Sequence, residues 1–257
     1  MKVARLDILW FSMLLLFSCK NSAEKNTFRI ATAASVQFAM EELVSEFERQ
    51  TGVRPQVIIN SSGKITAQVL SAAPYDVFVS ADLKYPLYLQ EKGLVKKGPE
   101  VYAEGRLVIW SVDSAITPSV ENLPNPLITH IAMASPEIAP YGKAARESLE
   151  YFNMYEKLGP RLVFGESISQ TNQFIISGAV GVGFTALSVV KAPRLEKKGR
   201  WSLVPPESYS PIQQGIAMLQ QPSDSEIAAA FYDFMFTDTA QHILQKYGYG
   251  IPETPPQ

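Results

Sequence analysis

The sequence predicts an α/β protein with two lobes, each built on a mostly parallel sheet flanked by helices. Two observations lead to this fold class. Short apolar runs typical of buried strands alternate with helical patterns at intervals of about 20–30 residues. The alternation restarts after a break, and proline-rich segments at 117–126 and 205–211 interrupt it. A chain that crosses to a second lobe and returns is expected to bind a small ligand in the cleft between the lobes.

The first block of expected elements covers residues 27–92. Residues 27–34 form an apolar run suited to a buried strand, and apolar residues from Val36 to Phe47 then recur on one helical face. Ser35 is the expected N-cap of this helix, and Gly52 its expected end. The next elements are expected at 56–59 (strand), 65–71 (helix), 76–80 (strand) and 83–92 (helix).

The second block begins at residue 106. Strands are expected at 106–110, 130–134, 161–164, 180–184 and 212–219, and helices at 142–152 and 169–177. Two further helices are expected to start at the caps Ser223 and Thr237. We therefore predict a first lobe made of residues 27–107 and 208–253, and a second lobe made of residues 108–207.

The composition excludes several classes of protein. The 257 residues include 23 Lys plus Arg and 25 Asp plus Glu, so the chain lacks the basic excess that nucleic-acid binding needs. One cysteine and two histidines are too few for a disulfide framework, an iron–sulfur cluster or a zinc site of Cys and His ligands. We expect no protein-bound metal and no nucleic-acid partner.

The N-terminus has the features of an export signal. Lys2 and Arg5 precede an apolar run, 8–17, that is too short to cross a bilayer. The run leads into Leu16-Phe17-Ser18-Cys19, which resembles the bacterial lipoprotein signal, where a lipid is attached to the cysteine after cleavage. We predict a lipoprotein signal peptide at 1–18, a flexible tether at 19–26, and an exported protein anchored to a membrane through Cys19. The alternative is a buried free thiol near an ordinary cleavage site.

No pattern in the sequence specifies catalysis. His130 opens an expected strand and His242 lies in an expected helix, so both are interpreted as structural residues. The acidic residues at 41, 42, 46 and 48 fall on the polar side of the first helix and are interpreted as a solvated face. Residues 181–186 fit the loose G-x-G-x-x-A pattern, but they lie within an expected strand. We predict a protein that is not an enzyme and has no cofactor.

Four helices are expected to begin directly after a strand, in the segments 33–35, 60–63, 139–142 and 165–169. The free N–H groups at a helix N-terminus form a site suited to an anion. Each segment alone could be an ordinary helix cap. Because two fall in each predicted lobe, all four could meet at one cleft.

The same segments resemble those of the molybdate-binding proteins of bacterial ABC importers. The resemblance covers about residues 28–251 and keeps the family's motif order. Its motifs are Ala33-Ala34-Ser35, Asn60-Ser61-Ser62-Gly63, Pro74 to Asp82 (PYDVFVSAD), Ala139-Pro140-Tyr141-Gly142, Gly165 to Ile168 (GESI), Gly181 to Ser188 (GVGFTALS), and the ending from Phe231-Tyr232 through Lys246-Tyr247-Gly248.

This resemblance implies a type II periplasmic-binding-protein fold that holds molybdate or tungstate between its lobes and delivers it to an ABC permease. By position, Ser35 and Ser62 would donate hydrogen bonds through hydroxyl and backbone N–H, and Tyr141 and Ile168 through backbone N–H alone. Some relatives add a tyrosine hydroxyl where this chain has Ala186. We expect a monomer.

Three alternatives stay open from the sequence. The first is a protein of the same fold that binds another small anion, such as sulfate. The second is a secreted serine hydrolase using Ser62, which would need a histidine within hydrogen-bonding distance. The third is a structural surface lipoprotein whose cleft binds nothing.

Overall fold

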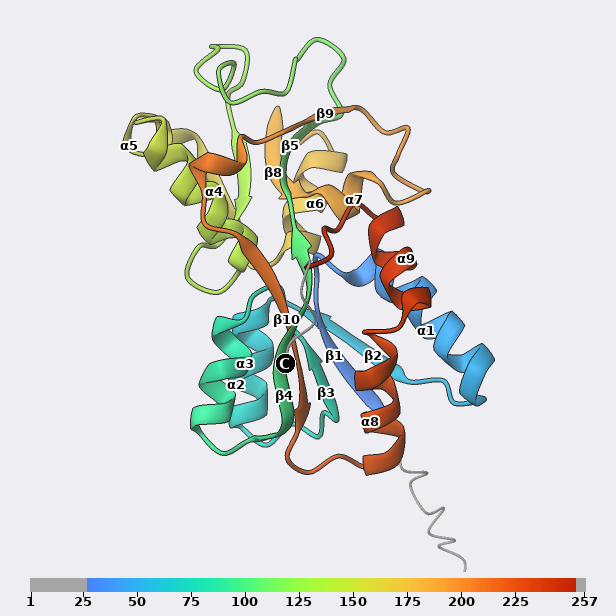
Figure 1. Cartoon of the computed structure of the whole chain (residues 1–257). Helices are drawn as coiled ribbons and strands as arrows, with labels where there is room; N and C mark the ends of the chain where they lie inside the picture. The colour runs from blue at the N-terminus through green and yellow to red at the C-terminus, as the bar shows by residue number, and fades with distance from the viewer. Residues whose placement is uncertain (1–26, 253–257) are drawn as a thin grey trace, which may run out of the picture.

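The computed structural model describes residues 27–252, which form two lobes, each with a five-stranded sheet and helices packed against it (Figure 1). The predicted two-lobed α/β class is confirmed. The predicted signal peptide, the tether and Cys19 lie outside the described residues. Within residues 27–252, none of the helices has the length and apolar character needed to span a bilayer.

The sheet of the first lobe has the strand order β2–β1–β3–β10–β4. Its strands are β1 (Arg29–Ala33), β2 (Gln56–Asn60), β3 (Val77–Val79), β4 (Val95–Gly105) and β10 (Ile212–Leu219). Its helices are α1 (Gln37–Thr51), α2 (Ser62–Leu70), α3 (Lys84–Glu91), α8 (Ser225–Phe234) and α9 (Asp238–Lys246). Helices α2 and α3 cover one face of the sheet, and α1 and α8 the other (Figure 1).

The sheet of the second lobe has the strand order β7–β6–β8–β5–β9. Its strands are β5 (Leu107–Ser111), β6 (Ile131–Ala134), β7 (Leu162–Gly165), β8 (Val182–Ala186) and β9 (Arg200–Leu203). Its helices are α4 (Pro140–Tyr151), α5 (Tyr155–Leu158), α6 (Ile168–Ile176) and α7 (Leu187–Val190), with short 3₁₀ turns at Gly159–Arg161 and Pro206–Ser208.

Each sheet is mixed rather than mostly parallel as predicted. In each, two strand pairs are parallel and two are antiparallel. The antiparallel pairs all involve β5 or β10, the two strands that enter their sheet directly from the other lobe. The chain reaches β5 from β4 through Arg106 and returns to β10 from β9 through residues 204–211. Neither strand is part of a strand–helix–strand crossover, so nothing forces it to be parallel.

Some expected boundaries were wrong, and two strands were missed. Both β4 and β9 are edge strands. In β4, charged residues and the Gly98-Pro99 pair break the apolar alternation that marks a strand. The cap of α8 is Asp224 instead of Ser223, and its carboxylate accepts from the N–H groups of Glu226 and Ile227.

Helix α1 ends as predicted but begins differently. Gly52 terminates it in the left-handed conformation, with φ of +74°, and its N–H donates to Glu48 O at 2.8 Å. The N-cap position is Val36, and no side chain caps the helix. The predicted cap, Ser35, lies one residue earlier, in the turn that connects β1 to α1. Its hydroxyl is therefore available for another role.

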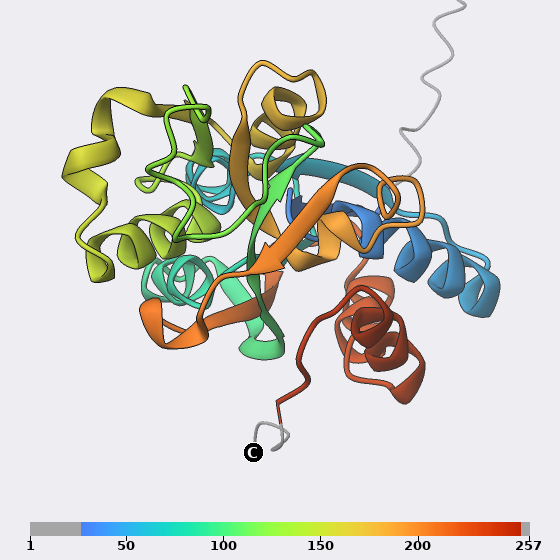
Figure 2. The ribbon, with the colours of Figure 1, turned by 90° about the horizontal axis from the view of Figure 1, so that it is seen from above.

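Aromatic packing joins the two ends of the chain in the first lobe. The rings of Phe28, Phe47, Phe231 and Phe234 form one buried cluster between α1 and α8. Phe47 and Phe231 meet edge to face, with ring centroids 5.2 Å apart. Helix α9 also lies beside α1 (Figures 1 and 2). The C-terminal helices thus complete the lobe in which the chain starts.

Candidate functional site

In the first lobe, Ser35 and Ser62 follow the carboxyl ends of two neighbouring strands. β1 and β2 are parallel, with Ala33 opposite Asn60, and Ala34 N donates to Asn60 O at 2.9 Å. Because parallel neighbours end at the same sheet edge, the segments that follow them lie side by side. Ser35 and Ser62 are therefore together at this edge.

The second lobe repeats this arrangement with Tyr141 and Ile168. Helix α4 follows β6, and α6 follows β7, its parallel neighbour. Ser135 N donates to Gly165 O at 2.7 Å just beyond these strands. The start of α4, with Tyr141, and the start of α6, with Ile168, thus share one edge of the second sheet.

Two hydrogen bonds across the lobe boundary bring these edges together. Gly63 N, at the start of α2, donates to Ile138 O, just before α4, at 2.9 Å. The Ser169 hydroxyl of α6 donates to Gln37 Oε1 of α1 at 2.8 Å. With the two pairs of neighbouring strands, these bonds close a ring of contacts through the four predicted positions. Ser35, Ser62, Tyr141 and Ile168 are 1%, 0%, 2% and 4% exposed.

The ring is rich in hydrogen-bond donors. The first N–H groups of a helix have no carbonyl partner within the helix. Among the described residues, nothing accepts a hydrogen bond from the backbone N–H of Ser35, Ser62, Tyr141 or Ile168. Helix α6 is also capped by the Ser167 hydroxyl, which accepts from Gln170 N. The positive ends of three helices and the turn before a fourth therefore meet at one buried place.

The Ser62 hydroxyl is held by the neighbouring PYDVFVSAD segment. Its oxygen accepts from Ala81 N at 3.0 Å and lies 3.1 Å from the Ser80 oxygen. The single Ser80 proton can go to Ser62 or to Asp82 Oδ1, 3.3 Å away, and the carboxylate is the stronger acceptor. A hydroxyl whose oxygen already accepts one hydrogen bond can give its own proton to another acceptor. Ser80 and Ala81 belong to the PYDVFVSAD motif, but the sequence did not reveal that they orient Ser62.

Two further serine hydroxyls at the ring have no hydrogen-bond partner among the described residues, those of Ser35 and Ser61. Ser61 is 3% exposed and directly precedes Ser62, yet the sequence did not single it out as a site residue. A buried hydroxyl without a partner is costly unless a ligand or water satisfies it. Asn60, which precedes Ser61 and Ser62, uses its side-chain oxygen to accept from Ser61 N at 3.0 Å.

Tyr141 contributes more than its backbone. Its side chain is buried, and burial raises the pKa of its hydroxyl well above the ordinary value. A Cβ atom at Gly105 would lie 2.1 Å from the Tyr141 hydroxyl oxygen, so the tyrosine side chain occupies space that only glycine leaves open. Gly105 ends β4, just before the chain crosses to the second lobe. The Tyr141 side chain therefore packs against the segment that crosses between the lobes.

Two cationic side chains near the ring are paired with carboxylates. Lys64 of α2 forms an ion pair with Glu166 across the lobe boundary, and Lys143 of α4 pairs with Glu147 at 3.4 Å. Burial raises the pKa of the Asp82 carboxyl, against the opposing effect of hydrogen bonds from Tyr85 N and the Ser80 hydroxyl. Within the described residues, no cluster of His, Cys, Asp and Glu could hold a metal ion. The ring therefore offers neutral donors to an acceptor.

A cavity of about 190 Å³ lies at the lobe boundary beside the start of α4. Both lobes and the returning crossing segment contribute to it. The residues lining it are Asp82, Leu83, Lys84, Pro140, Lys143, Ala144, Glu147, Ser210, Pro211, Ile212 and Gln213. Pro140 of this cavity directly precedes Tyr141 in the chain.

The hydrolase alternative receives no support from the surroundings of Ser62. Its hydroxyl contacts Ala81 N and the Ser80 hydroxyl, and both histidines are exposed at the protein surface. His242 bonds to Asp238 O within its own helix. Nothing near Ser62 in the described residues would act as its base.

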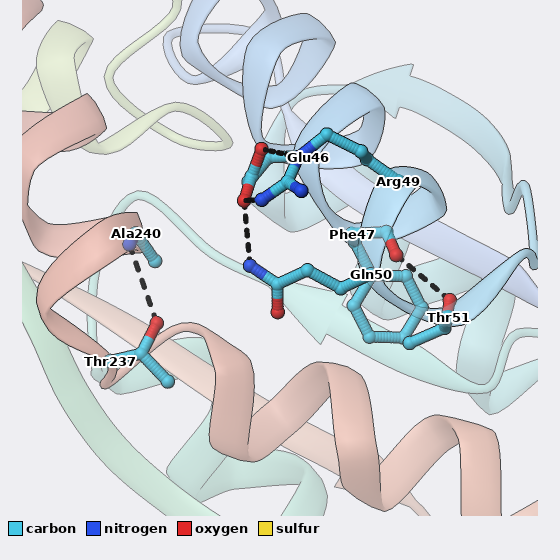
Figure 3. Close-up of polar contacts among 7 residues, drawn as sticks. All are labelled: Glu46, Phe47, Arg49, Gln50, Thr51, Thr237 and Ala240. Carbon is cyan, nitrogen blue, oxygen red and sulfur yellow. Dashed lines mark hydrogen bonds and ion pairs between the residues drawn. The ribbon is translucent and has the colours of Figure 1, made fainter.

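The acidic residues of α1 form ion pairs with basic side chains. Glu46 accepts from Arg49 at 2.6 and 2.8 Å and from Gln50 at 2.7 Å (Figure 3). These hydrogen bonds, that from Arg49 first, lower the pKa of Glu46 to about 2. The remaining pairs are Glu41 with Arg194, Glu42 with Lys246, and Glu48 with Arg54. These carboxylates form a polar outer side of the helix, as predicted.

Comparison with known proteins adds three findings. A family model described as bacterial extracellular solute-binding protein matches residues 28–250. The molybdate-binding protein ModA of Rhodobacter capsulatus is 37% identical over 221 residues, 85% of this chain and 86% of its own. The periplasmic molybdate-binding protein of Azotobacter vinelandii superposes with a TM-score of 0.84 at 31% identity, covering 88% of this chain and 100% of that one.

Proposed function

Because the chain belongs to the family of bacterial extracellular solute-binding proteins, we propose that it captures molybdate, or tungstate, between its lobes and delivers it to an ABC-transporter permease. The observation that carries the proposal is the ring of buried neutral donors at Ser35, Ser62, Tyr141 and Ile168. Binding would need no cofactor and no protein-bound metal. The protein would act outside the cytoplasmic membrane, as a monomer.

Neutral donors suit a doubly charged oxyanion. Hydrogen bonds to a charged acceptor are about twice as strong as those between neutral groups, and a dry site strengthens them further. A ring that contains only donors also rejects a protonated oxyanion, because the bound OH would face another donor. Phosphate, which is largely protonated near neutral pH, is therefore expected to bind poorly. Sulfate is fully ionised, so the size of the site must exclude it.

Calorimetric titration of the purified protein with molybdate, tungstate, sulfate and phosphate tests this function. We expect saturable binding of molybdate and tungstate, at least about tenfold tighter than that of sulfate. Equal affinity for sulfate would replace the molybdate assignment with the sulfate alternative. If no oxyanion binds and none raises the melting temperature of the protein, the structural-lipoprotein alternative is favoured.

We also propose that Cys19 carries a lipid that anchors the protein to a membrane. The support is the sequence alone: a basic start, a short apolar run and the Leu16-Phe17-Ser18-Cys19 segment. Cys19→Ser is expected to release the protein into the soluble fraction with an unchanged Kd for molybdate, because residue 19 precedes the described lobes. Cell fractionation with immunoblotting measures this, and Ser22→Ala serves as the matched control. A Cys19→Ser protein that still sediments with membranes contradicts the anchor.

A further inference from the structure

Three buried groups meet at the carbonyl oxygen of Ser35. The Ser188 hydroxyl donates to Ser35 O at 2.7 Å, and the Tyr249 hydroxyl donates to the same oxygen at 3.1 Å. The two hydroxyls lie 3.2 Å apart. Ser35, Ser188 and Tyr249 are 1%, 3% and 5% exposed, so water does not compete for these bonds. We call this set the Ser35 clamp.

The clamp joins three separate parts of the fold. Ser35 follows β1 in the first lobe, Ser188 lies in α7 of the second lobe, and Tyr249 lies in the C-terminal segment after α9. That segment runs from α9 past α7 (Figure 1). It is fixed there by two hydrogen bonds between Gly250 and Glu104, of 2.7 and 2.8 Å. Gly248 lies close to Leu187, since a Cβ atom at Gly248 would be 2.7 Å from Leu187 Cδ2.

The clamp controls how Ser35 presents its donors. A carbonyl oxygen has two lone pairs, and here two hydroxyls occupy them. Fixing this carbonyl restricts rotation of the residue that bears it. The Ser35 hydroxyl and the Ser35 N–H, which have no partner among the described residues, are therefore held in one orientation.

We propose that Ser188 and Tyr249 are positioning residues that hold Ser35 in its ligand-binding orientation and make that orientation depend on closure of the lobes. The proposal rests on the proposed function, because the ligand is the oxyanion bound by the ring. Because Ser188 belongs to the second lobe and Ser35 to the first, we infer that closure of the lobes brings the Ser188 hydroxyl onto Ser35 O. The clamp therefore favours the closed form and is expected to slow release of the anion more than it changes capture.

Ser188→Ala and Tyr249→Phe test this role. Loss of one buried hydrogen bond is expected to weaken molybdate binding about threefold to tenfold in each variant. Stopped-flow measurements should place this change in koff, with kon nearly unchanged. Tyr247→Phe is the matched control, because the Tyr247 hydroxyl bonds to Glu42 within the first lobe, at 3.1 Å. A purely structural role would instead lower the melting temperature of the ligand-free protein and leave koff unchanged.

A second measurement does not depend on the identity of the ligand. Spin labels at Glu91→Cys on α3 and Lys157→Cys on α5, both exposed and in different lobes, report the distance between the lobes by electron paramagnetic resonance (Figure 1). In a Cys19→Ser background, Ser188→Ala and Tyr249→Phe should shift the distances of the protein toward longer values. Failure of the wild-type protein to bind molybdate would refute the proposed function, and the distances would still test the clamp. Unchanged koff, or unchanged distances where molybdate does not bind, overturns the clamp.

Discussion

Gly63→Ala is expected to weaken molybdate binding about tenfold to a hundredfold while both lobes stay folded. A Cβ atom at this position would lie 2.8 Å from the Tyr85 hydroxyl oxygen, 2.9 Å from Ile138 O and 3.0 Å from Ile138 Cα. Ile138 belongs to the second lobe, and its backbone cannot turn aside as a flexible side chain can. Overpacking of this kind costs about 1–3 kcal/mol. The lobes would have to separate slightly, which also strains the bond from Gly63 N to Ile138 O.

Calorimetry for Kd and thermal unfolding of the ligand-free protein separate the two parts of this expectation. Gly159→Ala is the matched control, because a Cβ atom there would meet no atom within 4 Å beyond its two chain neighbours, and the backbone φ is −43°. The control should bind like the wild-type protein. If Gly63→Ala binds with unchanged affinity, the closed arrangement of α2 against the segment before α4 is not the form that holds the ligand.

Much of the fold could be predicted because its signals are local. Apolar residues from Val36 to Phe47 recur with the period of a helix that is buried on one face. The nearly continuous buried run from Ile212 to Leu219 is typical of a strand that is covered on both faces. β4 and β9 lack such a signal because an edge strand can carry charged and exposed side chains. Strand direction is not local either, and so the antiparallel entry of β5 and β10 was missed.

The candidate site divides in the same way. The strand-to-helix pattern singled out the four segments, and the resemblance to the molybdate-binding family assigned Ser35, Ser62, Tyr141 and Ile168 within them. Their meeting across the lobes depends on bonds such as that from Gly63 N to Ile138 O, which join residues far apart in sequence. Ser188 and Tyr249 have no sequence signal for their contact with Ser35 O, because 153 and 214 residues separate them from it.

Ser62→Ala is expected to weaken molybdate binding by about 1–3 kcal/mol, the cost of removing a donor from a buried charged acceptor. This corresponds to roughly a fivefold to 150-fold rise in Kd. The substitution also leaves Ala81 N without its acceptor, so the ligand-free protein should melt at a lower temperature. Kd must therefore be measured below the unfolding transition of the variant.

Two companion variants separate the direct role of Ser62 from its structural one. Ser80→Ala keeps the Ser62 hydroxyl and removes only the neighbouring hydroxyl 3.1 Å away, so its effect on Kd should be smaller. Ser71→Ala, at the exposed opposite end of α2, should leave Kd unchanged. An unchanged Kd for Ser62→Ala would remove this hydroxyl from the site and leave the unpartnered Ser61 hydroxyl as the donor of that strand end. A loss in Ser62→Ala that Ser71→Ala does not share would assign a direct ligand contact to the Ser62 hydroxyl, and a smaller loss in Ser80→Ala would show that the Ser80 contact helps to orient it.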